Sequence, residues 1–189
     1  MNLLVDELPN AVEIDGVEYA IETDFRVALR IMLAFEDDEL TTLEKQSVLL
    51  QNLYQKIPTN GQAAVDQGMK FLNGGLDGIR TREYHPRLYS FGKDAALILS
   101  AFQQTHGVDL EDIQMHWWKF MALFLDLGSE TAFCNLVGLR KRVKTGQASK
   151  EERQAARELG ELFDVPEPDL RTPDERDQEA EFMRLVKGG

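Results

Sequence analysis

The chain has 189 residues, of which 43% are hydrophobic, and this is enough material for a sizeable buried core. Its formal net charge of −12 argues against nucleic acid as a partner, because such binding begins with neutralisation of phosphates by Lys and Arg. No apolar run approaches the roughly 20 residues that a membrane-spanning helix needs, so we expect no contact with a membrane.

Residues 11–22, AVEIDGVEYAIE, predict a β-hairpin. Asp15-Gly16 is a favoured pair for a type I′ turn, because both central residues need positive φ. This turn places Ile14 opposite Val17. The alternating apolar residues, Val17 among them, then share one face that must pack on helices, since an isolated two-stranded ribbon is barely stable.

After the hairpin, apolar residues recur at helical spacing along most of the chain. Two helices are expected to begin with capping boxes, Thr41 with Glu44 and Ser149 with Glu152, in which each side chain accepts from the other residue's backbone N–H. Ser129 is expected to cap a third helix. The predicted helices cover 25–35, 43–57, 61–72, about 91–106, 115–127, 130–143 and 150–163, with a last, highly charged one from 173.

We therefore predict a mainly α-helical protein in which an N-terminal β-hairpin packs on a multi-helix domain. The domain is expected to span residues 1–145, with a candidate hinge at 73–92, where Gly and charged residues are frequent. Residues 146–189 hold few large apolar side chains. They are expected to form a polar, charged, helical C-terminal arm.

The charge is spread unevenly along the chain. Residues 1–75 hold 5 basic and 13 acidic side chains, residues 76–147 hold 9 and 8, and residues 148–189 hold 7 and 12. The middle third is near neutral, so specific association is easiest there. The basic run LRKRVK at 139–144 has two interpretations: contact with phosphate or an acidic protein, or stabilisation of a helix C-terminus, which we favour.

No residue pattern indicates catalysis. His85, His106 and His116 include no pair at i, i+4, and no HExxH or CxxC motif is present, so we expect no metal site. The Gly-rich stretch at 74–78 lacks the Lys-Ser/Thr of a phosphate-binding loop. Cys134 lies on the apolar side of a predicted helix and is interpreted as a buried structural thiol. We expect no cofactor and no enzyme activity.

The stretch MHWWKFMALFLDL, residues 115–127, holds both tryptophans and only three polar side chains. On a helix, His116, Lys119 and Asp126 fall along one line, and the rest of the circumference is apolar. Two interpretations stay open: a central core helix, or a helix with one edge left for a partner, since aromatic residues and Met are enriched in interfaces. The candidate partner-binding residues are Trp117, Trp118, Phe120, Met121 and Phe124.

Several motifs follow one another between residues 91 and 140. They are Asp94, Ala101-Phe102, a Gly-Val-Asp-Leu turn, His116-Trp117-Trp118-Lys119-Phe120, Ala122-Leu123-Phe124, and Gly138 with Arg140. This pattern resembles the most distinctive block of the bacteriophage gene-product-fifteen family, found in siphophages of Gram-positive hosts. The opening, with leucines before Pro9 and then the hairpin, is also similar to the family, so the likeness covers about residues 1–145.

The resemblance implies a non-catalytic tail assembly chaperone that binds the tape measure protein and keeps it soluble until tail tube protein polymerises around it. It places the protein in the host bacterial cytoplasm, and the absence of a basic segment at the N-terminus and the lone cysteine agree with this. Further candidate partners are the tail tube protein and other copies of the chain, as a homo-oligomer. The alternative is a structural minor tail or tail-completion protein retained in the virion.

Overall fold

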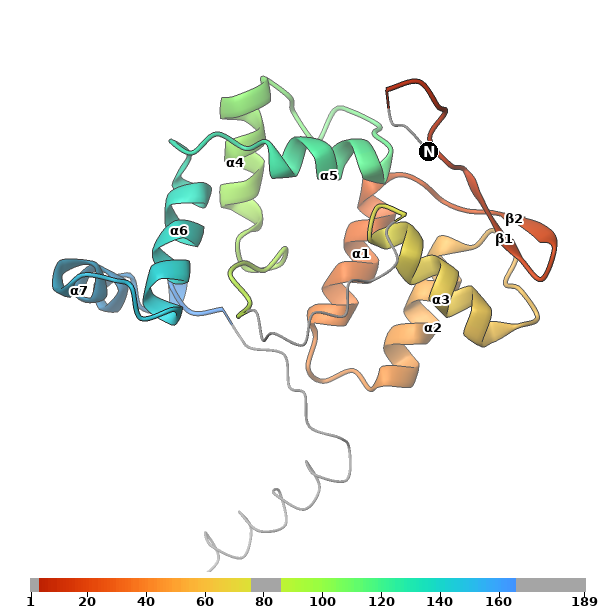
Figure 1. Cartoon of the computed structure of the whole chain (residues 1–189), viewed down its shortest axis with the longest axis horizontal. Helices are drawn as coiled ribbons and strands as arrows, with labels where there is room; N and C mark the ends of the chain where they lie inside the picture. The colour runs from red at the N-terminus through yellow and green to blue at the C-terminus, as the bar shows by residue number, and fades with distance from the viewer. Residues whose placement is uncertain (1–3, 76–85, 166–189) are drawn as a thin grey trace, which may run out of the picture.

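The computed structural model describes residues 4–75 and 86–165. Within them the chain forms one two-stranded antiparallel hairpin, seven α-helices and a short 3-10 helix, which confirms the predicted mainly helical fold with its N-terminal hairpin (Figure 1). The elements are β1 Ala11–Ile14, β2 Val17–Ala20, α1 Phe25–Glu36, α2 Thr42–Leu53, α3 Gly61–Leu72, α4 Ala95–His106, α5 Trp117–Leu125, α6 Ala132–Lys144, α7 Lys150–Leu159 and η1 Gly160–Leu162. The charged helix predicted from 173 lies outside the described residues.

The hairpin has the predicted turn and register. Asp15 and Gly16 have φ of 51° and 76°, and Ile14 pairs with Val17. The apolar face of the hairpin was expected to pack on helices, and this prediction is only partly correct. Ile14 is 4% exposed, whereas Val17 is 52% exposed. The tip of the hairpin therefore projects beyond the helices on which its base packs.

Both predicted capping boxes are present. Thr41 Oγ1 accepts from the Glu44 N–H at 3.3 Å, and Glu44 Oε2 accepts from the Thr41 N–H at 2.8 Å. Ser149 and Glu152 form the same two bonds at 3.2 and 2.9 Å. The bond from the backbone N–H at each cap favours the ionised carboxylate, so the pKa values of Glu44 and Glu152 lie below their ordinary range.

Ser129 does not cap α6, so that prediction is wrong. Residues 128–131 instead form a turn in which the Thr131 N–H donates to Gly128 O at 3.0 Å. Thr131 is the cap, and its Oγ1 accepts from the Cys134 N–H at 3.2 Å. The turn displaces the start of the helix by two residues relative to the sequence-based expectation.

The helix predicted to reach Ile57 ends at Leu53. Tyr54 leaves the helix to form an isolated β-bridge with Ile21, and its hydroxyl donates to Ala64 O at 2.7 Å. Burial of the phenol raises the pKa of Tyr54 to about 12. Ile57 lies past this break and is 50% exposed, so it does not belong to the inner face of α2.

Helices α2 and α3 pack closely at Gly68. A Cβ there would lie 2.7 Å from Leu49 Cδ2 and 3.0 Å from Leu53 Cδ2. We expect Gly68→Ala to destabilise the fold by about 1–3 kcal/mol in urea unfolding, because overpacking outweighs the better helix propensity of Ala. Gly61→Ala is the control, since nothing lies within 4 Å of its Cβ position. Equal stability of the two variants would contradict the close approach.

One continuous apolar core runs from the hairpin to the start of α6. Helix α1 lies near its centre and contacts both α2 and α5, while β1 packs on α3. The hairpin, α2 and α3 occupy one end of the long axis, and α6 and α7 occupy the other (Figure 1). This arrangement brings segments that are far apart in the sequence to the two sides of α5.

The predicted domain boundary at residue 145 and the candidate hinge at 73–92 stay predictions. Residues 76–85 of the candidate hinge and residues 166–189 of the predicted arm lie outside the described residues. The remaining hinge residues, 86–92, are held by hydrogen bonds on both sides. The beginning of the arm packs on α6 through α7 and η1, and it buries Ala148, Ala156 and Val165.

Candidate partner-binding site

Helix α5 begins two residues later than predicted, because His116 is its N-cap. His116 Nδ1 accepts from the Trp118 N–H at 3.0 Å, so the protonated Nε2 donates to Pro9 O at 3.0 Å. The ring therefore fixes the start of the helix and ties it to the chain before the hairpin. The sequence suggested that His116 lies on a polar stripe of the helix with Lys119. It does not, because it precedes the first residue of the helix.

Most of the aromatic side chains of α5 are in the core. The exposed fractions are 1% for Trp117, 9% for Trp118, 0% for Phe120 and 6% for Phe124. Phe120 stacks on Phe25 of α1 at 5.0 Å and on Phe102 of α4 at 4.9 Å between ring centroids. The stretch is thus the central helix of the fold, and partner binding by these four residues stays a prediction.

The two indole N–H groups of α5 donate to carbonyls at the C-terminal end of α3. Trp117 Nε1 donates to Leu72 O at 2.9 Å, and Trp118 Nε1 donates to Phe71 O at 2.7 Å. Carbonyls in the last turn of a helix have no partner within the helix, so the Trp117 bond satisfies Leu72 O, whereas Phe71 O also accepts from the Gly74 N–H at 3.0 Å. Gly75, with φ of 78°, passes over the Trp118 ring, where a Cβ would lie 2.8 Å from Cη2.

An apolar hollow of about 430 Å³ lies beside α5, between α1, the end of α3 and residues 89–91. Among the described residues, no charged side chain lines it. Leu125, at the end of α5, is 79% exposed. The apolar side chains lining this apolar hollow include Met32, Leu72, Tyr89, Phe91, Met121 and Leu125. Of the five predicted binding residues, Met121 and the two tryptophans line it, whereas Phe120 and Phe124 do not.

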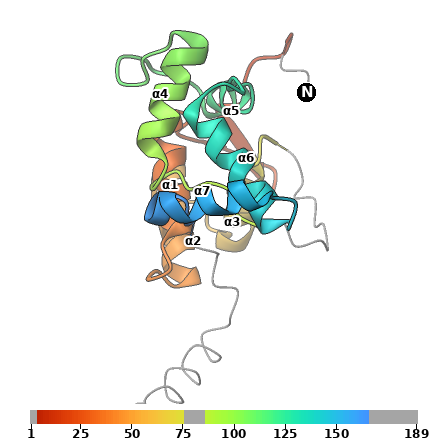
Figure 2. The same cartoon turned by 90° about the vertical axis from the view of Figure 1, so that its left-hand side faces the viewer.

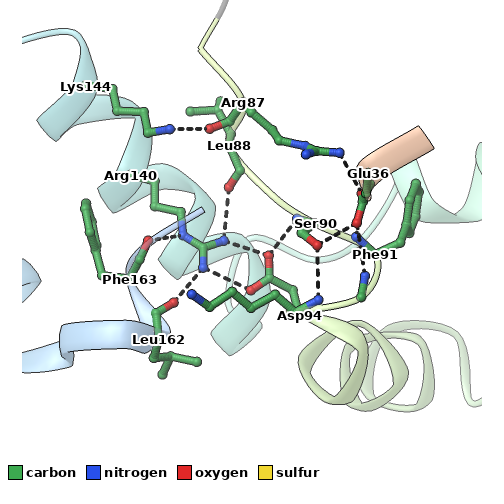
Figure 3. Close-up of polar contacts among 12 residues, drawn as sticks. Glu36, Arg87, Leu88, Ser90, Phe91, Asp94, Arg140, Lys144, Leu162 and Phe163 are labelled. Carbon is green, nitrogen blue, oxygen red and sulfur yellow. Dashed lines mark hydrogen bonds and ion pairs between the residues drawn. The ribbon is translucent and has the colours of Figure 1, made fainter. Parts of the chain in front are cut away.

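Residues 87–92 form one wall of the apolar hollow, and polar side chains hold this segment from behind. We call Glu36, Ser90, Asp94 and Arg140 the polar junction (Figure 3). They come from the end of α1, the wall segment, the start of α4 and the middle of α6. The junction therefore connects three helices through the segment that carries Tyr89 and Phe91.

Arg140 is the centre of the junction. It is 0% exposed and Asp94 is 1% exposed, and their two parallel bonds measure 2.7 and 3.0 Å. The remaining guanidinium bonds go to the carbonyls of Leu88 at 3.1 Å, Phe163 at 2.8 Å and Leu162 at 2.6 Å. All five N–H donors of this buried side chain thus have acceptors, which offsets the cost of removing its charge from water.

Glu36 holds the same segment from the side of α1. Its carboxylate accepts from the Ser90 hydroxyl at 2.6 Å and from the Phe91 N–H at 3.0 Å, and it pairs with Arg87 at 3.1 Å. Burial raises the pKa of Tyr89, and the neighbouring Glu36 carboxylate raises it further, while Arg87 opposes the change. The wall is thereby fixed at successive residues rather than at a single point.

Sequence patterns did not identify Asp94 and Arg140 as partners. Both belong to the motif pattern of residues 91–140, but they lie 46 positions apart. In the sequence Asp94 directly follows Lys93 and Arg140 stands in the basic run at 139–144, so neither charge is distinctive. Of the basic residues in LRKRVK, Arg140 is buried, whereas Lys141, Arg142 and Lys144 lie in the last turn of α6, as the favoured interpretation expected.

No group of three or more His, Cys, Asp or Glu residues that could hold a metal ion occurs in residues 4–75 and 86–165. Cys134 is only partly buried, and its thiol lies 3.5 Å from Leu127 O. In the same part of the chain, no helix is long and apolar enough to cross a membrane.

The fold and the site define a mainly helical protein with an apolar hollow backed by a buried polar junction. A family model described as Bacteriophage Gp15 protein matches residues 4–165, and the chain belongs to this family. The resemblance seen in the sequence is thereby confirmed, and the match reaches past the end predicted at residue 145. No curated protein and no solved structure matches the chain.

Proposed function

We propose that the chain is a non-catalytic tail assembly chaperone, which binds the tape measure protein and keeps it soluble while the tail tube assembles around it. The observation that carries this proposal is membership of the phage family over residues 4–165. The tail tube protein is a further proposed partner, met when the chaperone is displaced. The host cytoplasm, where tails assemble, is the proposed location.

The apolar hollow is the proposed contact with the tape measure protein. Without charged lining residues it can take apolar side chains from one stripe of an amphipathic helix without demanding a fixed sequence. Met32 and Met121 add side chains that adapt to differently shaped partners. Each contact is then weak, and many copies along one long partner supply the total affinity.

Leu125→Glu tests this surface. The side chain is 79% exposed, so the fold should persist, while a carboxylate is placed next to the apolar hollow. We expect recovery of the tape measure protein in a co-purified complex to fall about tenfold, since each 1.4 kcal/mol of lost binding is a factor of ten. Leu43→Glu is the matched control, because Leu43 is 75% exposed on α2 and does not line the hollow.

The assay is co-expression of the full chain with the tape measure protein, followed by solubility and co-purification. The proposal predicts that the tape measure protein is soluble only when the chain is present. An insoluble tape measure protein beside a freely eluting chain would overturn it. Mass spectrometry of purified virions tests the alternative of a retained tail component, because a chaperone is absent from the finished particle.

A further inference from the structure

The hairpin end of the molecule is acidic. Residues 10–24 contain five acidic side chains and no Lys or Arg. Glu13 and Glu18 are exposed and face each other across the two strands, an arrangement of like charges that disfavours the hairpin. Val17, beside them at the tip, is 52% exposed. The tip of the hairpin therefore presents a pair of glutamates on one face of the ribbon and the exposed Val17 on the other.

The α6–α7 end is basic. Residues 131–157 hold seven basic and two acidic side chains in a chain whose net charge is −12. Arg140 is buried, and Arg142 pairs with Glu152 at 2.7 Å. Among the cations without an ion pair in residues 4–75 and 86–165, Arg153 and Arg157 lie one turn apart on α7 and are exposed.

A second hollow, of about 440 Å³, lies at this basic end. We call it the α7 hollow. Val143, Ala156 and Phe163 supply its apolar lining, and Arg153, Arg157, Gly160 and Asp164 complete it. Two positive side chains and one negative one, Asp164, thus accompany an apolar floor, so the hollow keeps a net positive charge that is opposite to the charge of the hairpin end.

The two complementary features cannot meet within one molecule. The hairpin and α7 lie at opposite ends of the long axis in Figure 1, and Figure 2 shows α7 across the end that faces the viewer. A contact between them requires a second copy. Because the two surfaces differ, the contact is heterologous, and repetition produces a ring or an open chain of copies.

We propose that copies of this chain associate head to tail, with the hairpin tip of one copy docked in the α7 hollow of the next. Val17 meets the apolar floor, while Glu13 and Glu18 approach Arg153 and Arg157. The positive charge also relieves the repulsion between the two glutamates. Exposed ion pairs contribute little individually, so each contact is weak and sensitive to salt.

An acidic protein fits this basic end better than nucleic acid does. Phosphate binding needs cations without nearby competitors, but Glu151 and Glu158 are exposed on the same helix. Among the described residues that line the α7 hollow, Phe163 is the single aromatic one, whereas stacking of successive bases needs several aromatic side chains. The overall charge of −12 also repels a polyanion at long range.

Sedimentation velocity of the full chain alone is the first measurement. We expect a mean size that grows with protein concentration, and an association constant that falls at least about tenfold between about 0.01 and 1 M salt, because the Debye length shrinks from roughly 30 to 3 Å. A monomer at every concentration and salt would overturn the proposal. So would a chain that stays monomeric but shifts duplex DNA in a gel.

Charge reversal at the two ends gives the decisive test. Glu13→Lys with Glu18→Lys places two positive side chains opposite the positive Arg153 and Arg157, and it keeps a like-charged pair, so hairpin stability should change little. Arg153→Glu with Arg157→Glu places two negative side chains on α7 opposite the negative Glu13 and Glu18. Each variant alone should associate about tenfold more weakly than the wild type, and an equimolar mixture should recover association, since ends of opposite charge can again meet.

Arg30→Glu with Lys93→Glu is the matched control for the arginine variant, because it changes the net charge by the same amount and sign at exposed positions outside both ends. It should associate like the wild type. If the mixture fails to recover association, or the control weakens it equally, the proposed contact is wrong. These experiments contain no tape measure protein, so their outcome is independent of whether the proposed function holds.

Discussion

Asp94→Ala is expected to destabilise the fold by about 3–5 kcal/mol, because it leaves a buried guanidinium without its counter-charge. Neither side chain of the Asp94–Arg140 pair has any solvent exposure. Urea unfolding followed by circular dichroism measures the change. Arg142→Ala is the control, since it removes an ion pair whose side chains are 46% and 33% exposed, and it should cost at most about 1 kcal/mol.

An apolar double variant, Asp94→Leu with Arg140→Met, separates the ion pair from the other bonds of the junction. Buried ion pairs can often be replaced by apolar residues without loss. Here Arg140 also donates to three backbone carbonyls, and burying each without a partner costs about 1–3 kcal/mol. The double variant should therefore remain less stable than the wild type. Wild-type stability would show that the carbonyl bonds contribute little.

Trp117→Ala is expected to cost about 3–5 kcal/mol, the range for truncation of large aromatic residues in a core. Its side chain is 1% exposed, stacks on Phe120 at 5.5 Å and donates to Leu72 O. Thermal or urea unfolding should show a much lower midpoint. Leu125→Ala, at a position 79% exposed, should change stability by no more than about 0.5 kcal/mol. An unchanged midpoint for Trp117→Ala would contradict its place in the core.

Local patterns predicted those parts of the fold that local interactions determine. The Asp15-Gly16 turn needs only its own two residues, and each capping box needs only a side chain and a backbone group three positions away. The predicted third helix, 61–72, has the observed bounds of α3 for the same reason. Asn60 caps its start, and the helical pattern stops at Asn73.

Tertiary contacts determined the features that sequence patterns missed. Tyr54 leaves α2 because it pairs with Ile21, and His116 begins α5 because its ring also reaches Pro9. Apolar periodicity continues through both places, so it extends each helix too far. The Asp94–Arg140 pair and the apolar hollow depend on how separate helices pack, which periodicity does not describe.

The aromatic stretch shows the same limit at the candidate site. Residue type identified α5 as important, since aromatic residues and Met are common both in cores and in interfaces. The packing of α1 and α4 on Phe120 shows that most of the stretch belongs to the core, and residue type alone did not show this. The proposed contact surface is the edge next to Met121 and Leu125, and residue type alone did not distinguish that edge.

The bonds that end α3 also bear on the order in which the protein can fold during synthesis. Residues 1–75 contain the hairpin and three helices. Two of their carbonyls, Leu72 O and Phe71 O, accept hydrogen bonds from the indole N–H groups of Trp117 and Trp118, which are synthesised later. The Phe25 N–H likewise donates to Met115 O at 2.9 Å, and Met115 also belongs to the later part of the chain. A nascent chain that has only its first half outside the ribosome lacks these donors and acceptors. The hairpin end therefore reaches its final stability only after α5 has emerged.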